Sequence, residues 1–143
     1  MNKFFLLLTL LCLSLSARAH DAEVDGIFYD LDAANKTATV TYKGDNYNSY
    51  SNEYSGDVVI PETVTYNGIT YSVTSLGDYC FADCRSLTSI YMLPTTPPRA
   101  VQYIFFNTPL KTVYVVNENA KRAYQAQGYW NNYAIVVKRT GKK

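Results

Sequence analysis

Short segments in which apolar and polar residues alternate predict a chain that is mainly β. The strands expected from this pattern cover residues 27–31, 36–42, 58–60, 64–66, 69–73, 90–92, 113–115 and 135–137. Polar residues at 32–35 and the pair Asn67-Gly68 predict tight turns and hence two β-hairpins, because these residue types tolerate the backbone angles of such turns. A narrow apolar stripe predicts one short helix from about 118 to 127, with Asn117 as its N-cap and Gly128 as its stop.

One segment of the chain returns after 23 residues. LTSIYM at 87–92 is echoed by LKTVYV at 110–115, and each copy follows an aromatic turn. A fixed period of this length is typical of stacked repeats, in which a unit buries its apolar face against the next unit. We expect equivalent inward positions in one parallel ladder for the pairs Val58/Ile60, Ile90/Met92 and Val113/Val115. Behind this ladder we expect Leu76, Phe81, Leu87 and Leu110, with one helical turn over 79–82 capped by Asp78.

Residues 73–90, VTSLGDYCFADCRSLTSI, resemble the BspA-type leucine-rich repeat, whose unit reads roughly V-x-x-I-G-x-x-A-F-x-x-C-x-x-L-x-x-I. The chain departs from that pattern at Leu76 and Cys80, where the family usually has Ile and Ala. The flanks at 24–29, 93–98, 108–114 and 124–130 resemble the opening and closing regions of the group. Because only one complete repeat is present, the resemblance implies a miniature leucine-rich-repeat-like solenoid with an N-terminal β-hairpin cap and a C-terminal helix-strand cap.

The first 19 residues predict a cleavable signal peptide. Lys3 precedes an apolar run from 4 to 13, and Ala17-Arg18-Ala19 fits the small-x-small cleavage pattern. A run this short makes a retained membrane anchor the less favoured alternative. The predicted division is a signal peptide at 1–19, an N-terminal hairpin cap and Tyr-rich loop at 20–56, a repeat region at 57–116, and a C-terminal helix-strand cap and tail at 117–143. The expected location is therefore secreted or cell surface, with no membrane span after cleavage.

The charge balance gives no sign of a nucleic-acid partner. The chain has 13 basic and 12 acidic residues, and loss of the first 19 would leave 11 basic against 12 acidic. Two cysteines would remain, Cys80 and Cys84, and we favour free, buried thiols over a strained disulfide. Their spacing, with no neighbouring histidine, is weak evidence for zinc.

No arrangement of residues predicts catalysis. His20 is the one histidine, and it would stand at the new N-terminus, where a general base is hard to position. Phosphate-loop and dinucleotide motifs do not occur. We therefore expect no enzyme, no cofactor and no metal. A pair of carboxylates for glycoside hydrolysis is left open, because only their separation decides it.

Tyrosine is the unusual component, with 14 in the chain. The loop from 43 to 56 is polar and carries three of these rings, and two more stand on predicted strands. Such rings add contact area at low entropic cost, which makes them candidate ligand contacts. The candidates are Tyr47, Tyr50, Tyr54, Tyr91 and Tyr114. The alternative for the loop is that its rings cover the flank of the sheet and cap the solenoid end.

The family resemblance implies adhesion or binding to proteins or glycans of a host or a neighbouring cell. Fibronectin and fibrinogen are the ligands associated with the founding members. The resemblance brings no catalytic residues and no fixed ligand motif. The alternative function is a structural or assembly role, in which the short open ladder pairs with another copy or docks on a larger surface complex.

Overall fold

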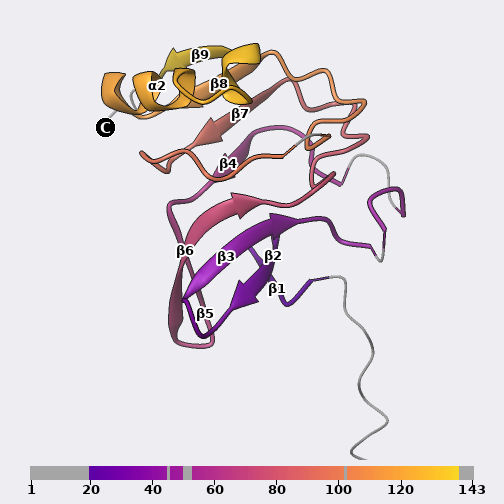
Figure 1. Cartoon of the computed structure of the whole chain (residues 1–143). Helices are drawn as coiled ribbons and strands as arrows, with labels where there is room; N and C mark the ends of the chain where they lie inside the picture. Colours follow the sequence, from indigo (N-terminus) through magenta and orange to yellow (C-terminus); the bar gives the residue numbers. More distant parts are fainter. Residues whose placement is uncertain (1–19, 45, 50–52, 102, 139–143) are drawn as a thin grey trace, which may run out of the picture.

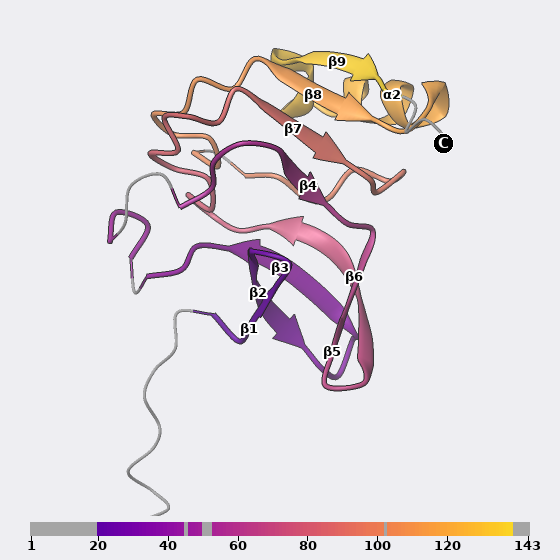
Figure 2. The same cartoon turned by 180° about the vertical axis from the view of Figure 1, so that it is seen from behind.

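The computed structural model describes residues 20–44, 46–49, 53–101 and 103–138. Within them the chain forms two β-sheets, one α-helix and a short 3-10 helix (Figure 1; Figure 2 gives the reverse view). The elements are β1 (Ala22–Val24), β2 (Ile27–Asp32), β3 (Thr37–Thr41), β4 (Val58–Ile60), β5 (Thr63–Tyr66), β6 (Ile69–Leu76), β7 (Ser89–Met92), β8 (Thr112–Val115), α2 (Glu118–Gln125), η2 (Trp130–Asn132) and β9 (Ala134–Val137). The expectation of a mainly β chain with a short helix is confirmed.

The first sheet has five strands in the order β1-β2-β3-β6-β5. Antiparallel hairpins join β1 to β2, β2 to β3 and β5 to β6, and the turn of the last is Asn67-Gly68 with positive φ at both residues. β3 and β6 pair in parallel, with a bulge between Ala38 and Thr39. The edge strands β1 and β5 approach each other, so the sheet nearly closes on itself. Two of its five strands, β5 and β6, lie in the predicted repeat region at 57–116 and not in the predicted N-terminal cap at 20–56.

The second sheet is the parallel ladder that the repeat predicts. Its order is β4-β7-β8-β9, and the register places Val58 opposite Ile90 and Ile90 opposite Val113. The predicted pairing of Ile60, Met92 and Val115 is confirmed too, and all of these inward side chains are buried. β9 adds a fourth strand, in which Ile135 lies opposite Val113. Figure 1 shows this sheet above the first one, with α2 beside β8 and β9.

The turns ahead of β7 and β8 stack on each other as the strands do. The Phe81 amide donates to the Ile104 carbonyl over 3.1 Å, and the Phe81 and Phe105 rings stack 5.4 Å apart. The predicted helical turn over 79–82 is wrong, because Tyr79 has φ +57°, outside the right-handed helical region. Tyr103 holds φ +68° in the second turn. The two turns are therefore copies of one unusual conformation.

The predicted helix forms and ends earlier than expected. The Asn117 side chain accepts a hydrogen bond from the Ala120 amide over 2.8 Å, as an N-cap does. The helix stops at Gln125, short of the predicted end. Its buried face includes Tyr124, whose hydroxyl donates to the Pro94 carbonyl over 2.9 Å. This bond fixes the helix to the segment that follows β7.

Cys80 and Cys84 are free and buried, as favoured from the sequence. Burial raises the pKa of both thiols, the Cys80 pKa strongly. A thiol held in its neutral form is a poor nucleophile and a poor metal ligand. Both cysteines therefore act as small apolar side chains of the core.

Candidate functional site

The outward side of the parallel sheet carries a continuous row of apolar and aromatic side chains. Side chains alternate along a strand, so burial of Ile90 and Met92 on the inner side places Tyr91 on the outer side. The pairing register then sets one residue from each strand side by side. We call this set the outer row: Val59, Tyr91, Tyr114 and Val136.

The outer row is exposed at its two ends, and its two central side chains pack against each other. Val59 is 44% exposed and Val136 is 40% exposed, whereas the two tyrosines between them are half-buried. The Tyr91 and Tyr114 rings stack with centroids 4.8 Å apart and an interplanar angle of 24°. Single apolar residues on a surface are ordinary, but a contiguous row across a whole sheet is typical of a contact surface.

Lys138 lies over this tyrosine pair from the end of β9. Its Nζ is 4.8 Å from the Tyr91 ring centroid and 5.1 Å from that of Tyr114, and it donates to the Tyr91 hydroxyl. That hydrogen bond raises the pKa of the Lys138 ammonium, with Asp57 among the weaker contributors. The cation and the ring stack restrict each other, so the centre of the outer row is ordered before any partner arrives.

Tyr54, one of the predicted contacts, is a core residue. It is 3% exposed, and its ring lies 4.8 Å from that of Phe81. Its hydroxyl accepts from the Phe28 amide over 3.1 Å and donates to the Thr41 carbonyl over 2.7 Å. These two bonds close the end of the β2–β3 ladder. Tyr54 is therefore buried against the end of the first sheet, and the expectation of a ligand contact at this ring is corrected.

Of the other two loop tyrosines, the structure describes Tyr47 but not Tyr50. Tyr47 is half-buried and stacks on Tyr79 at 4.2 Å, and Tyr79 stacks in turn on Tyr103 at 5.4 Å. Tyr50 lies outside the described residues. Tyr79 and Tyr103 were not among the expected contacts, although they occupy equivalent places in the two turns that precede the repeated strands. Their shared position, 24 residues apart, was the available signal.

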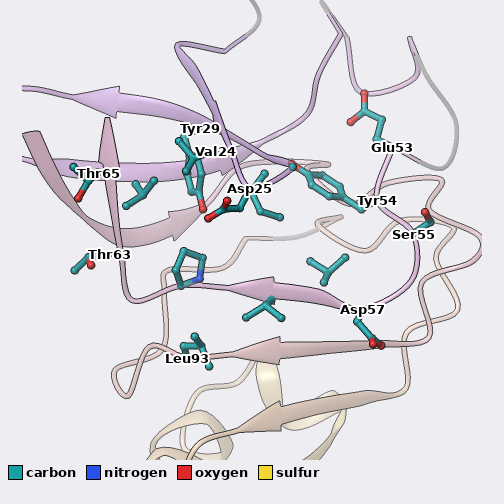
Figure 3. A pocket seen from close by; sticks show the side chains of 16 residues that line it. Val24, Asp25, Tyr29, Glu53, Tyr54, Ser55, Asp57, Thr63, Thr65 and Leu93 are labelled. Carbon is teal, nitrogen blue, oxygen red and sulfur yellow. The ribbon is translucent and has the colours of Figure 1, made fainter. Parts of the chain in front are cut away.

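A cleft of about 840 Å³ separates the two sheets on the free side of β4 (Figure 3). It is walled by the β1–β2 turn, the segment ahead of β4, β4 itself and β5. Acidic residues Asp25, Glu53 and Asp57 line it, and no lysine or arginine of the described residues does. In the part of the chain that the structure describes, no three His, Cys, Asp or Glu side chains lie close enough together to hold a metal ion. The cleft is thus a concave feature that shares only Val59 with the outer row.

Comparisons with known proteins give one distant likeness. No protein-family model matches the chain, and no curated protein sequence matches it. A crystal structure of a leucine rich cell surface protein from Faecalibacterium prausnitzii A2-165 is similar, with 23% sequence identity and a TM-score of 0.49. The match covers 82% of this chain and 31% of that one, so the chain spans about a third of the neighbour's length. In the described part of the chain, no helix has the length and apolarity needed to cross a membrane.

Replacing Tyr54 with phenylalanine should lower the free energy of unfolding by about 1–3 kcal/mol. The ring would stay, but the buried Phe28 amide and Thr41 carbonyl would lose their partner, and an unpaired buried group costs about that much. Urea unfolding measures the change. Tyr47→Phe is the matched control, because the Tyr47 hydroxyl bonds to no described residue. Equal stability of the two variants would contradict the assignment of Tyr54 to the core.

Alkaline pH should unfold the protein more readily than neutral pH. Burial, with Asp25 nearby, raises the pKa of Tyr29 to about 12, and burial also raises the pKa of Tyr54 and Tyr124. Tyrosines of the unfolded chain ionise near pH ~10, so above that pH the unfolded state binds fewer protons and gains stability. We expect the free energy of unfolding to fall between about pH 10 and 12, and Tyr29→Phe to reduce the slope. A flat profile across that window would show that these hydroxyls are solvated.

Proposed function

We propose that this chain is a secreted or cell-surface binding module that holds proteins or glycans of a host or neighbouring cell on its outer row, and that it is not an enzyme. The observation that carries the proposal is the apolar row across all four strands of the parallel sheet. The signal-peptide pattern of residues 1–19 supports export, and those residues lie outside the described part of the chain. The resemblance to adhesive repeat proteins points to the same class of function.

The physics of the outer row favours binding. A partner that covers Val59, Tyr91, Tyr114 and Val136 removes apolar surface from water at about 25 cal/mol per Å². The tyrosine rings already hold one orientation through their stack and Lys138, so little side-chain entropy is lost on contact. The Tyr91 hydroxyl accepts from Lys138 and can still donate to a partner, so it can add a polar contact. Rigid aromatic anchors at the centre of a patch are the usual hot spots of interfaces.

A second candidate function, assembly with another copy, is favoured by the free edge of β9. The Lys138 amide donates to the Val115 carbonyl of β8, and the Ala134 amide donates to the carbonyl of Lys111, just ahead of β8, so both amides point toward that strand. Backbone groups alternate along a strand, and those of Ile135 and Val137 therefore point away from β8. An unpaired edge of this kind accepts another strand. This role predicts a stable homo-oligomer, which the binding role does not need.

The test is a solid-phase screen of the purified protein against extracellular-matrix proteins and a glycan array, followed by light scattering on a sizing column. The binding role predicts a saturable ligand for a monomeric protein. Fibronectin and fibrinogen are the first two proteins to test. A homo-oligomer that captures nothing from either panel would favour assembly. A monomer that captures nothing would contradict both candidates.

A further inference from the structure

We infer that the cleft between the sheets is a second binding site, which takes an extended basic peptide segment along the free edge of β4. This site lies on the far side of β4 from β7 and shares only Val59 with the outer row. The inference does not depend on the proposed function. Three features of the described residues carry it: an unpaired strand edge, acidic charge, and the hydroxyl of a buried tyrosine that reaches the cleft wall.

The strand edge comes from the way in which β4 pairs. Among the strands that the structure describes, β4 is terminal in the second sheet and pairs with β7 alone. The Ile60 carbonyl accepts from the Leu93 amide over 3.0 Å, so the backbone groups of Ile60 point toward β7. The N–H and C=O of Val59 then point the opposite way, toward the cleft that Val59 lines. An extended chain placed there would satisfy both groups, which is recognition by strand addition.

The charge on the cleft selects the occupant. Figure 3 shows the Asp25 side chain directed into the cleft from the β1–β2 turn, and Asp57 at the start of β4. The Glu53 carboxylate is already used, because it accepts from the backbone amides of Lys43 and Gly44. With no basic residue of the described part lining the cleft, the charge of Asp25 is balanced best by a lysine or arginine of a partner. Acidic peptides should be excluded for the same reason.

Tyr29 adds an independent sign of a ligand. It is 1% exposed, yet its hydroxyl points into the cleft beside Asp25 and bonds to no described residue (Figure 3). A tyrosine hydroxyl is protonated at physiological pH, so this one can donate a hydrogen bond there. A donor held at the wall of a cleft suits a peptide carbonyl. Around it stand apolar side chains that suit the alternate residues of an extended segment, namely Val24, Ile27, Pro61, Val64 and Leu93.

Together these features specify the occupant. Its backbone pairs with Val59, a carbonyl accepts from Tyr29, and a basic side chain meets Asp25. In an extended chain successive side chains face opposite sides, so basic and apolar residues that alternate meet the acidic and apolar walls separately. A metal ion or a small amine would leave the strand edge unused.

Isothermal titration with three capped hexapeptides tests the site. The first alternates valine and lysine, the second alternates valine and glutamate, and the third is the lysine peptide with N-methyl groups on alternate amides. We expect the lysine peptide to bind with one-to-one stoichiometry, the glutamate peptide not to bind, and N-methylation to weaken binding at least about tenfold. Equal binding of the lysine and glutamate peptides, or no effect of N-methylation, would overturn the inference.

Two variants and a control locate the peptide. Asp25→Asn keeps the turn, because asparagine is favoured at positive φ, and Tyr29→Phe keeps the ring. Each should weaken the lysine peptide about fivefold to tenfold. Glu23→Gln removes the same charge from an exposed residue of β1 outside the cleft and should change little. If Glu23→Gln weakens binding of the lysine peptide as much as Asp25→Asn does, the peptide is held by the overall charge of the protein and no site exists in the cleft. Circular dichroism confirms that each variant is folded.

Discussion

Replacing Phe81 with alanine should lower the free energy of unfolding by about 3–5 kcal/mol, the largest change we expect from a single substitution. Phe81 has no exposed surface. Its ring stacks on Phe105 and meets Tyr54 at 4.8 Å, so it joins the two repeated turns to the loop that closes the first sheet. A domain of this size has only about 5–15 kcal/mol of stability in total. The variant should therefore melt far below the wild type or fail to fold.

The matched control for this substitution is Phe106→Ala. Phe106 belongs to the second of the two stacked turns, as Phe81 belongs to the first, but it is 46% exposed. Removing its ring leaves no cavity, so we expect a loss below about 1 kcal/mol. Urea unfolding of both variants, followed by tyrosine fluorescence, measures the difference. Equal losses would mean that the core does not run through Phe81 as described.

Replacing both tyrosines of the outer row with alanine should weaken binding of a captured partner at least about 30-fold, or about 2 kcal/mol. The expectation follows from the position of Tyr91 and Tyr114 at the centre of an otherwise aliphatic row. Losing both rings also leaves Lys138 without the hydroxyl and the ring faces that hold it. The measurement is a titration of wild type and double variant with the same partner.

A second tyrosine variant separates a local effect from a general one. Tyr103 is 55% exposed in the turns at the side of the fold, away from the outer row. Tyr103→Ala removes comparable exposed aromatic surface and should leave the affinity for the partner within about twofold. If Tyr103→Ala abolishes binding while the Tyr91 and Tyr114 variant keeps it, the contact surface lies on the turns.

The parallel ladder was predictable from sequence because each of its features is local and repeated. LTSIYM and LKTVYV carry the same alternation of inward and outward residues, so their superposition fixes the register and places Tyr91 and Tyr114 outward. The N-cap at Asn117 and the turn at Asn67-Gly68 depend on single residue types with one strong preference each. These elements follow from sequence without knowledge of the rest of the chain.

Pairings between distant segments were not predictable in the same way. β6 pairs in parallel with β3, but neither strand has a sequence feature that indicates the other as its partner. Each strand has an alternation of apolar and polar residues that is compatible with several partners. The pairing is decided by burial of side chains in the complete fold. The cleft is a consequence of that choice, because it opens between the first sheet and β4. For this reason the sequence did not predict that Asp25 and Tyr29 line a common cleft.

Tyr54 and Tyr79 show two further limits of sequence patterns. The loop that contains Tyr54 is polar on either side, which predicts exposure, yet two hydrogen bonds to backbone groups make burial of this one ring favourable. Tyr79 sits in a left-handed conformation that tyrosine rarely adopts, so a right-handed turn was the better expectation. Its ring then stacks between Tyr47 and Tyr103, a contact that depends on that conformation.

The most direct test of the outer row is an NMR titration of protein with labelled tyrosine rings by a partner captured in the solid-phase screen. Ring signals report contact at each residue while the fold stays intact. The binding role predicts that the signals of Tyr91 and Tyr114 shift or broaden with saturation, while those of Tyr47 and Tyr103 hold their positions. Saturable changes at Tyr47 and Tyr103, with Tyr91 and Tyr114 unmoved, would contradict the assignment of the outer row as the binding surface.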